Sequence, residues 1–500
     1  MLHRLTLLAF LAGPSMADTP VASPLSVVPR TAQEISRIAA VVAPTKDFTK
    51  AEPFEAKPAG GATVRLRAGT DAFSQFSGNM PFERQMNFNL GNALFTKSWV
   101  ASPASTLASD GLGPLFNARG CQDCHLKDGR GHVPAPGEAA VSLFLRLSMP
   151  GGTAPDGIKD WIATIPEPTY GGQLQNFSTT SVPAEAHMGL TYTEQTVQLN
   201  GETASLRVPQ YTVDGVGYGT PKPDMMISPR IAPQMIGLGL LEAIPAADIL
   251  ARVDEDDANG DGISGRASIV PSPQMGQPML GRFGLKAGAA TIMDQSAGAF
   301  SDDMGLSTTL HPDPWGDCTA AETACRSARH GQEPGIRDGL EVDRESLDLV
   351  TFYARNLAVP ERRNIDDPTV LQGKKVFYDL GCTGCHTAKY VTDRLQGQPE
   401  QSFQLIWPYS DLLLHDMGAG LADNRPEGRA TGREWKTPPL WGIGLTSQVS
   451  GHTEFLHDGR ARSLLEAILW HGGEAQAQRD AVAALPKPDR AALIAYVESL

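Results

Sequence analysis

Long apolar runs, excess positive charge and cysteine are all scarce in this chain of 500 residues. Beyond its first residues, no segment is long and apolar enough to span a bilayer, so we expect no transmembrane segment. Lys and Arg number 42 against 56 Asp and Glu, a formal net charge of −14, which argues against nucleic acid and anionic lipid as partners. With 41% apolar and only 20% charged residues, the composition is that of a globular chain.

Four of the six cysteines lie in two copies of one short motif, Cys121-Gln122-Asp123-Cys124-His125 and Cys382-Thr383-Gly384-Cys385-His386. This motif is typical of covalent c-type haem attachment, in which the histidine after the second thiol is the proximal iron ligand. A four-thiolate zinc site is the alternative, but it leaves both histidines unexplained. The sequence therefore predicts two covalently bound haem c groups, with His125 and His386 on the irons.

Two further features indicate an oxidising compartment. Residues 1–17 resemble a secretory signal peptide, with a positive start, an apolar run and a small-x-small cleavage site. The remaining cysteines, Cys318 and Cys325, are expected to form a disulfide, because their spacing is wider than that of a redox-active thiol pair. We therefore expect a periplasmic protein.

The pattern of elements predicts a mainly α protein with two cytochrome c-like haem domains, the first interrupted by a large mixed α/β insertion. Each domain has an opening helix, a haem motif, loops and a closing helix; the closing helices are expected at 344–358 and from Pro488 onward. The expected boundaries are 18–74 for an N-terminal arm, 75–365 for the first domain, about 133–280 for its insertion, and 366–500 for the second domain.

The residue on the far side of each haem decides between electron transfer and catalysis. Gly281-Arg282 and Gly459-Arg460 precede two similar stretches, which we interpret as the distal segments. After the second pair comes His471, the candidate sixth ligand of the C-terminal haem. Met417 competes with it, and His415 and His457 are weaker candidates.

The first distal segment contains an amide and an acid instead. Gln295 and Asp303 could orient bound peroxide and move a proton between its oxygens, with Asp302 as a neighbour of no assigned role. A solvated acidic loop is the other interpretation. His132 and His330 are candidate ligands of this iron in a resting state.

An acidic run from Asp254 to Gly262 resembles the start of a calcium loop, with Asp257, Asn259 and Asp261 as alternating oxygen ligands. Position twelve of that register is Ser268 and not a glutamate. The alternatives are a calcium site and a solvated acidic turn.

Longer motifs carry a family resemblance. The run Asp110-Gly111-Leu112-Gly113-Pro114-Leu115-Phe116-Asn117 before the first haem motif, and Leu412-Leu413-Leu414-His415-Asp416-Met417-Gly418 in the second unit, resemble the bacterial di-haem oxidoreductase family. Gly432-Arg433-Glu434-Trp435 and Phe455-Leu456-His457-Asp458-Gly459-Arg460 do so as well. The family lies within the di-haem cytochrome c peroxidase and MauG superfamily.

The resemblance implies an N-terminal haem that meets peroxide and a C-terminal haem that relays electrons. It implies that Gln295 and Asp303-Met304-Gly305 line the peroxide pocket, although the peroxidases have Glu where Asp303 stands. It also places His471 at the distal position where the peroxidases have Met and MauG has Tyr.

We therefore expect an enzyme that reduces hydrogen peroxide with electrons from a small redox donor protein, such as a cytochrome or a cupredoxin. The alternatives are a di-haem electron carrier without catalysis and a MauG-like oxidation of a protein substrate.

Overall fold

The computed structural model describes residues 22–500, so the expected signal peptide lies outside the described residues. No helix in this part of the chain is long and apolar enough to cross a membrane. Its α-helices are α1 (Ala32–Val42), α2 (Phe82–Phe95), α3 (Cys121–Cys124), α4 (Leu238–Glu242), α5 (Ala246–Leu250), α6 (Ile292–Met304), α7 (Thr323–Arg326), α8 (Arg344–Asn356), α9 (Pro368–Asp379), α10 (Gly418–Leu421), α11 (Thr446–Ser450), α12 (Leu464–Leu469), α13 (Gln476–Ala484) and α14 (Lys487–Ser499).

The expectation of a mainly α protein is wrong. Only 29% of the chain is helical, 18% is strand, and the strands form many small sheets. They are β1 (Val27–Val28), β2 (Val100–Ala101), β3 (Asp110–Leu112), β4 (Leu115–Phe116), β5 (Leu143–Pro150), β6 (Thr164–Ile165), β7 (Phe177–Ser178), β8 (His187–Leu199), β9 (Glu202–Asp214), β10 (Met226–Ile231), β11 (Ile269–Ser272), β12 (Gln277–Leu280), β13 (Tyr390–Val391), β14 (Arg394–Leu395), β15 (Leu405–Ile406), β16 (Leu414–Asp416) and β17 (Glu434–Lys436). The physical reason is the 51 Gly and 38 Pro, which keep most helices short and let the long connections pair as strands.

Two helix pairs repeat one packing arrangement. In α2, a Cβ on Gly91 would lie 2.2 Å from the carbonyl oxygen of Leu349 in α8, so only glycine allows this close approach. In α9, a Cβ on Gly373 would likewise lie 1.9 Å from the carbonyl oxygen of Ala492 in α14. The opening and closing helices of both units therefore pack against each other through a glycine.

The aromatic residues around these crossings repeat as well. Four residues after Gly91, Phe95 lies 5.1 Å from Tyr353, measured between ring centroids. Four residues after Gly373, Phe377 lies 5.3 Å from Tyr496. Both phenylalanines also lie near the histidine of a haem motif, at 6.4 Å for His125 and 6.2 Å for His386. The two units thus share a common internal frame.

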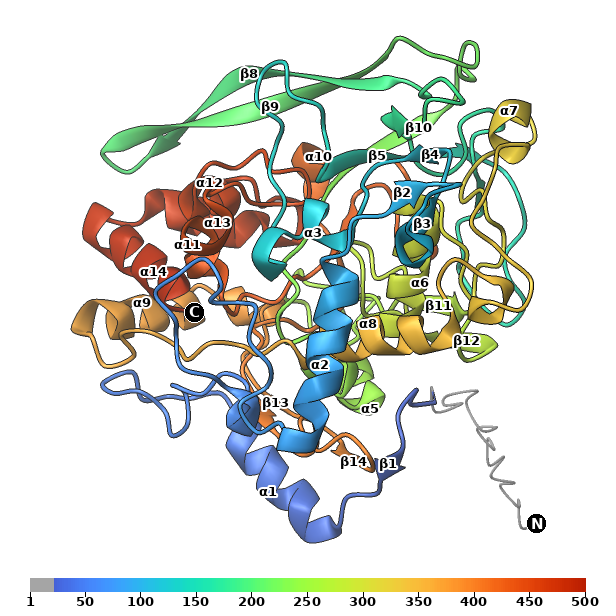
Figure 1. Ribbon diagram of the computed structural model, residues 1–500. Helices are drawn as coiled ribbons and strands as arrows, with labels where there is room; N and C mark the ends of the chain where they lie inside the picture. The colour runs from blue at the N-terminus through green and yellow to red at the C-terminus, as the bar shows by residue number, and fades with distance from the viewer. Residues whose placement is uncertain (1–21) are drawn as a thin grey trace, which may run out of the picture.

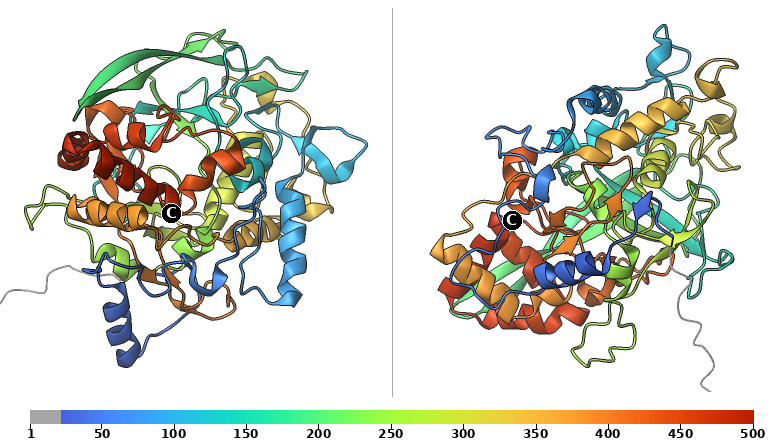
Figure 2. Two further views of the ribbon diagram at one scale, coloured as in Figure 1. Left: turned by 90° about the vertical axis from the view of Figure 1, so that its left-hand side faces the viewer. Right: turned by 90° about the horizontal axis from the view of Figure 1, so that it is seen from below.

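The largest β feature is the hairpin of β8 and β9, paired in register from His187 with Asp214 to Leu199 with Glu202. It lies along one side of the molecule beside the red helices α12 and α13 (Figures 1 and 2). Its Val197, Leu199 and Leu206 are buried in the same apolar cluster as α9 and α14. A second sheet has the strand order β10-β5-β6, and its strands, like β8 and β9, lie within residues 133–280.

The N-terminal arm is attached to the second unit by buried ion pairs. Glu55, only 2% exposed, lies 2.8 Å from the Nζ of Lys374 in α9 and also pairs with Arg362. The arm also contains the short helix α1, which begins with a capping box between Thr31 and Glu34.

Candidate functional site

The first haem motif forms the short helix α3 and ends at His125. The Nδ1 of His125 lies 2.7 Å from the carbonyl oxygen of Pro233, which leaves Nε2 without a hydrogen-bond partner among residues 22–500. Burial lowers the pKa of this imidazole to about 4, so the ring is neutral. A neutral ring held by a carbonyl through Nδ1 is the usual state of a metal-ligating histidine.

The second motif repeats this geometry. Cys382 begins a turn of 3₁₀-helix, and the Nδ1 of His386 lies 2.9 Å from the carbonyl oxygen of Tyr409. Burial likewise lowers the pKa of His386 to about 4. Within the described residues, both proximal candidates therefore have an Nε2 without a hydrogen-bond partner and a ring fixed through Nδ1.

The four cysteines of the two motifs are free thiols; Cys121, Cys124 and Cys382 lie in apolar clusters, and Cys385 lies beside His415. Within the described residues, the only group of side chains close enough to share a metal ion is Cys385, Asp411 and His415. Since the other three thiols of the motifs do not join it, the structure contradicts a four-thiolate zinc site. The donor set fits two haem groups, one at each motif.

The two distal segments have the same local structure. An isolated bridge joins Phe283 to Ala289 in the first segment, and another joins Phe455 to Ala461 in the second. Two residues later, a hydroxyl caps a helix in each unit: Thr291 begins α6 and Ser463 begins α12, each accepting from a backbone N–H three residues on. The bridge and the helix cap therefore repeat, but the two Gly-Arg pairs do not correspond: Gly281-Arg282 precedes the first bridged residue, Phe283, whereas Gly459-Arg460 precedes the second, Ala461.

This repeat pairs His471 with Ala299, because each lies eight residues after its capping residue (463 + 8 and 291 + 8). The Nδ1 of His471 lies 2.8 Å from the carbonyl oxygen of Ala467, and Nε2 has no hydrogen-bond partner within the described part of the chain. Burial lowers its pKa. The charge of His471 also acts on the pKa of His386, so the two rings lie near each other. The first unit has only a methyl group at this position.

The other candidates for the second haem differ in their contacts. Both ring nitrogens of His415 lie within hydrogen-bond distance of carboxylates, so neither is free for iron. His457 stacks on Trp435 with the ring centroids 3.9 Å apart. Met417 is partly buried in the cluster of the second unit, and the glycine after it packs against Gly473, close to His471.

Asp303, near the end of α6, lies beside the first haem motif. Its carbonyl oxygen accepts hydrogen bonds from the N–H groups of Asn117 and Ala118. After burial, the Asp303 charge is the next largest cause that raises the pKa of Cys121 to about 12. Burial raises the pKa of Asp303 itself to about 6, although the nearby Arg146 opposes this. An acid with this pKa can hold a proton near neutral pH.

The amide beside Asp303 is Gln173, from the insertion. Its Nε2 lies 2.8 Å from Oδ1 of Asp303 and 2.6 Å from Oδ1 of Asn117, and the side chain is fully buried. The neighbouring Asp302 points to a different partner, the guanidinium of Arg146 at 3.0 Å. Sequence reasoning missed Gln173, because no local motif marks a contact between residues 130 positions apart.

The structure does not bring Gln295 and Asp303 together. Gln295 is exposed and lies eight residues earlier on α6, about 12 Å along the helix axis. The ring of His132 lies at the surface beside His452, and His330 is exposed. The role predicted for Gln295 stays a prediction.

The acidic loop bonds mainly to itself. Asp257 accepts from the N–H of Gly262, Asn259 from Asp261, and Asp261 from Ile263. A Cβ on Gly384 of the second haem motif would lie 2.5 Å from Ile263, so the end of this loop covers that motif. Calcium binding by Asp257, Asn259 and Asp261 stays a prediction.

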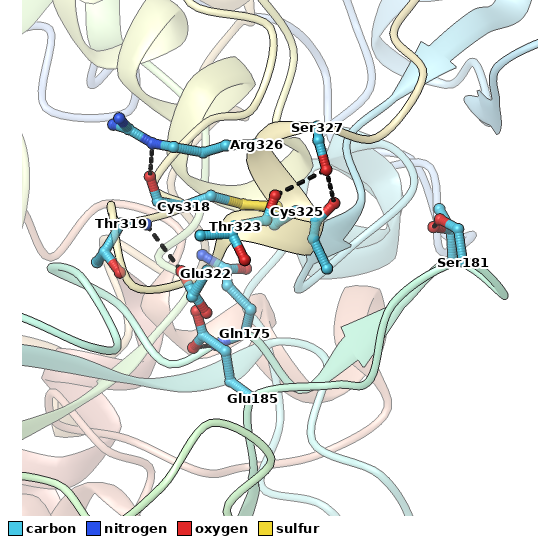
Figure 3. The surroundings of a disulfide bond; sticks show 12 residues. Gln175, Ser181, Glu185, Cys318, Thr319, Glu322, Thr323, Cys325, Arg326 and Ser327 are labelled. Atoms are coloured by element: carbon cyan, nitrogen blue, oxygen red, sulfur yellow. Dashed lines mark hydrogen bonds between the residues drawn. A yellow bond between two sulfur atoms is a disulfide. The ribbon is translucent and has the colours of Figure 1, made fainter.

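A disulfide joins Cys325, in helix α7, to Cys318 in the loop before that helix (Figure 3). Inside the loop, Thr319 donates its N–H to Glu322, and the side chain of Arg326 binds the carbonyl oxygen of Cys318. The buried carboxyl of Glu322 faces that of Glu185 from the insertion. The disulfide thus fixes a loop that packs on the insertion.

Residues 54–500 match the family described as "Di-haem oxidoreductase, putative peroxidase", and the chain belongs to this family. Haem cofactors and a di-haem redox function follow from the membership. No curated protein matches. One solved structure, hydrazine synthase of Kuenenia stuttgartiensis pressurised with 20 bar xenon, is 18% identical over 41% of this chain and 70% of that chain. Its TM-score of 0.23 is too low to support an argument.

Proposed function

We propose that this chain reduces hydrogen peroxide at the first haem and receives the electrons through the second. The observation that carries this is the pairing of Ala299 with His471. With His471 on the second iron, that haem is six-coordinate and suited to electron transfer. With Ala299 at the equivalent place, the first iron keeps an open sixth position.

The chain would hold each haem covalently, through thioether bonds from Cys121 and Cys124 to one porphyrin and from Cys382 and Cys385 to the other. His125 and His386 would bind the irons through their free Nε2 atoms. When bound, such haems supply redox-active iron and, at an open position, a site for peroxide.

Reduction of hydrogen peroxide to two waters takes up two electrons and two protons. The electrons would come from the donor protein, and Asp303 would donate one proton to the departing oxygen and be reprotonated from solvent. Its raised pKa keeps a proton on the carboxyl at mildly acidic pH, and Gln173 fixes Oδ1, which leaves Oδ2 for that proton. General acid–base catalysis of this kind typically contributes ~10²–10⁴-fold. Gln173 orients Asp303 from a part of the chain remote in sequence.

A continuous series of contacts supports transfer between the two units. Ile231 lies two residues before the carbonyl that holds the first haem histidine, and it donates its N–H to the carbonyl oxygen of His457. His457 stacks on Trp435, which pairs across β16 and β17 with His415. The Nδ1 of His415 lies 3.5 Å from the Sγ of Cys385. This series begins near one haem motif and ends at the other.

The negative net charge favours a positively charged donor protein, such as a small cytochrome or cupredoxin. The disulfide is consistent with an oxidising compartment, and we place the protein in the periplasm.

The spin state of each iron tests the proposal. In the fully oxidised protein, electron paramagnetic resonance should show one low-spin ferric haem and one ferric haem whose signal changes when cyanide binds. In the half-reduced protein only the haem that stays ferric gives a signal, so absorption spectra report the reduced haem. Peroxide should then be consumed in the presence of a reduced small cytochrome. Two haems that stay low-spin and exclude cyanide at both redox levels would contradict the proposal and favour the electron carrier.

A further inference from the structure

His415 is held between two carboxylates. Its Nε2 lies 2.9 Å from Oδ2 of Asp411, and its Nδ1 lies 2.7 Å from Oε2 of Glu474. A neutral imidazole has one N–H and one lone pair, so one of its nitrogens would face a carboxylate oxygen without a proton between them. With both carboxyls ionised, both contacts are favourable only when both nitrogens carry hydrogen. The geometry therefore makes His415 an imidazolium.

The pKa directions agree with this charge. Burial alone would lower the pKa of His415, but the hydrogen bonds to Asp411, Cys385 and Glu474 raise it well above its ordinary value. Burial also opposes the ionisation of Glu474, yet the hydrogen bond with His415 lowers the pKa of this carboxyl to about 2. Only 2% of His415 is exposed, so water screens its charge weakly.

Asp411, His415 and Glu474 lie against the second haem motif. Cys385 directly precedes His386, and its Sγ lies 3.5 Å from the Nδ1 of His415. On the other side, Glu474 belongs to the turn that follows His471. The charged group therefore bridges the haem motif and the distal segment.

Cys385, Asp411 and His415 do not form a metal site once haem is attached to Cys385. Cys385, Asp411 and His415 have the spacing of metal ligands. A thioether sulfur, however, is no longer a thiolate and is a much weaker ligand. In addition, both nitrogens of His415 are already occupied by hydrogen bonds to carboxylates.

We propose that Asp411, His415 and Glu474 form a fixed charge triad, with a net charge of −1, that sets the reduction potential of the second haem. This rests on the proposed attachment of haem at Cys382 and Cys385. A charge buried beside a redox centre favours one oxidation state over the other, because the low dielectric of the interior does not screen it. Negative charge stabilises the ferric state and lowers the potential, and positive charge does the opposite.

The experiment is a redox titration of the second haem in three variants of the full chain. His415→Gln makes the triad −2, so its potential should fall; the reduced fraction at a fixed potential should drop roughly tenfold, which is 59 mV for one electron. Asp411→Asn and Glu474→Gln both make the triad neutral, so the potential should rise. Asp411 is buried and Glu474 lines a polar pocket, so Asp411→Asn should give the larger rise.

Asp416→Asn is the matched control. Asp416 is the adjacent carboxylate, but its side chain is 38% exposed and pairs with Arg433, so its removal should leave the potential nearly unchanged. A shift of the same sign in His415→Gln and Asp411→Asn would point to loosened packing and overturn the charge triad. Should His415→Gln not fold, Glu474→Gln decides alone: a rise supports the triad, and no change overturns it.

Haem loading separates this inference from the function it rests on. The pyridine haemochrome spectrum of the wild type reports covalent haem without any turnover. A wild type that binds no haem c would contradict the proposed function. A loaded protein with three unshifted variants would contradict only the charge triad.

Discussion

Gln173 donates a hydrogen bond from Nε2 to Oδ1 of Asp303 over 2.8 Å, and joins the insertion to the end of α6. The hydrogen bond from Gln173 and the burial of Asp303 have opposite effects on the pKa of Asp303. Burial raises the pKa of Asp303 to about 6, and the hydrogen bond from Gln173 lowers it, because it stabilises the ionised form. Gln173 is therefore a positioning residue whose effect should appear in a pH profile.

Replacing Gln173 by Leu should move that profile. Without the amide, the pKa of Asp303 rises further, so the carboxyl keeps its proton to higher pH. The falling limb of the peroxidase rate should shift upward in pH. Gln175→Leu is the control, since Gln175 contacts the backbone carbonyl of Asp302 and not the carboxylate. An unchanged limb in Gln173→Leu would show that the amide does not govern the acid.

Asp303→Asn should slow peroxide reduction by ~10²–10⁴-fold while cyanide still binds. The raised pKa gives the sign: Asp303 is protonated below about pH 6 and loses its proton as the pH rises through that value. The wild-type rate of peroxide reduction should therefore fall above about pH 6, and the pH–rate profile of the variant should lack this falling limb. Asp302→Asn, which removes the partner of Arg146, should retain the limb. Stopped-flow kinetics from pH 5 to about 8 would measure both.

Ala299→His should fill the sixth coordination position of the first haem iron. Ala299 lies eight residues after its helix cap, as His471 does, but within α6, whereas His471 follows the end of α12. The equal spacing puts a histidine at 299 in the corresponding place of the first distal segment. The first iron should become low-spin, cyanide binding should be lost, and peroxide turnover should stop. The reciprocal variant His471→Ala should turn the second haem high-spin. A second haem that changes only in Met417→Ala would assign methionine as its ligand.

The main helices and the two haem motifs could be predicted from the sequence. The helix expected at 344–358 is α8, and the capping Asp367 does begin α9. These are local signals: a capping side chain and an apolar stripe act within a few residues. The haem motifs are equally local, and both place their histidine in a half-buried position with Nδ1 held by a backbone carbonyl.

The errors concern long-range packing. Strand pairing between distant loops, as in β1 with β14, has no local signal, and it makes the protein less helical than expected. The sequence predicts the amide partner of Asp303 at Gln295, in the same distal segment, but the amide that contacts Asp303 is Gln173 from the insertion. The pairing of Ala299 with His471 became visible only once the bridges and caps fixed the register of both segments.

The last prediction concerns the acidic loop that packs on Gly384. If calcium binds Asp257, Asn259 and Asp261, saturating calcium should raise the melting temperature, since a ligand at 100 times its Kd adds about 2.7 kcal/mol. Chelation should reverse the rise and perturb the spectrum of the second haem, because Ile263 covers its motif. Asp257→Asn keeps an acceptor for Gly262 but removes one charge, so it should abolish the response. The exposed neighbour Asp256 is the control: Asp256→Asn should respond like the wild type. No calcium by elemental analysis and no thermal response would leave the loop an acidic turn.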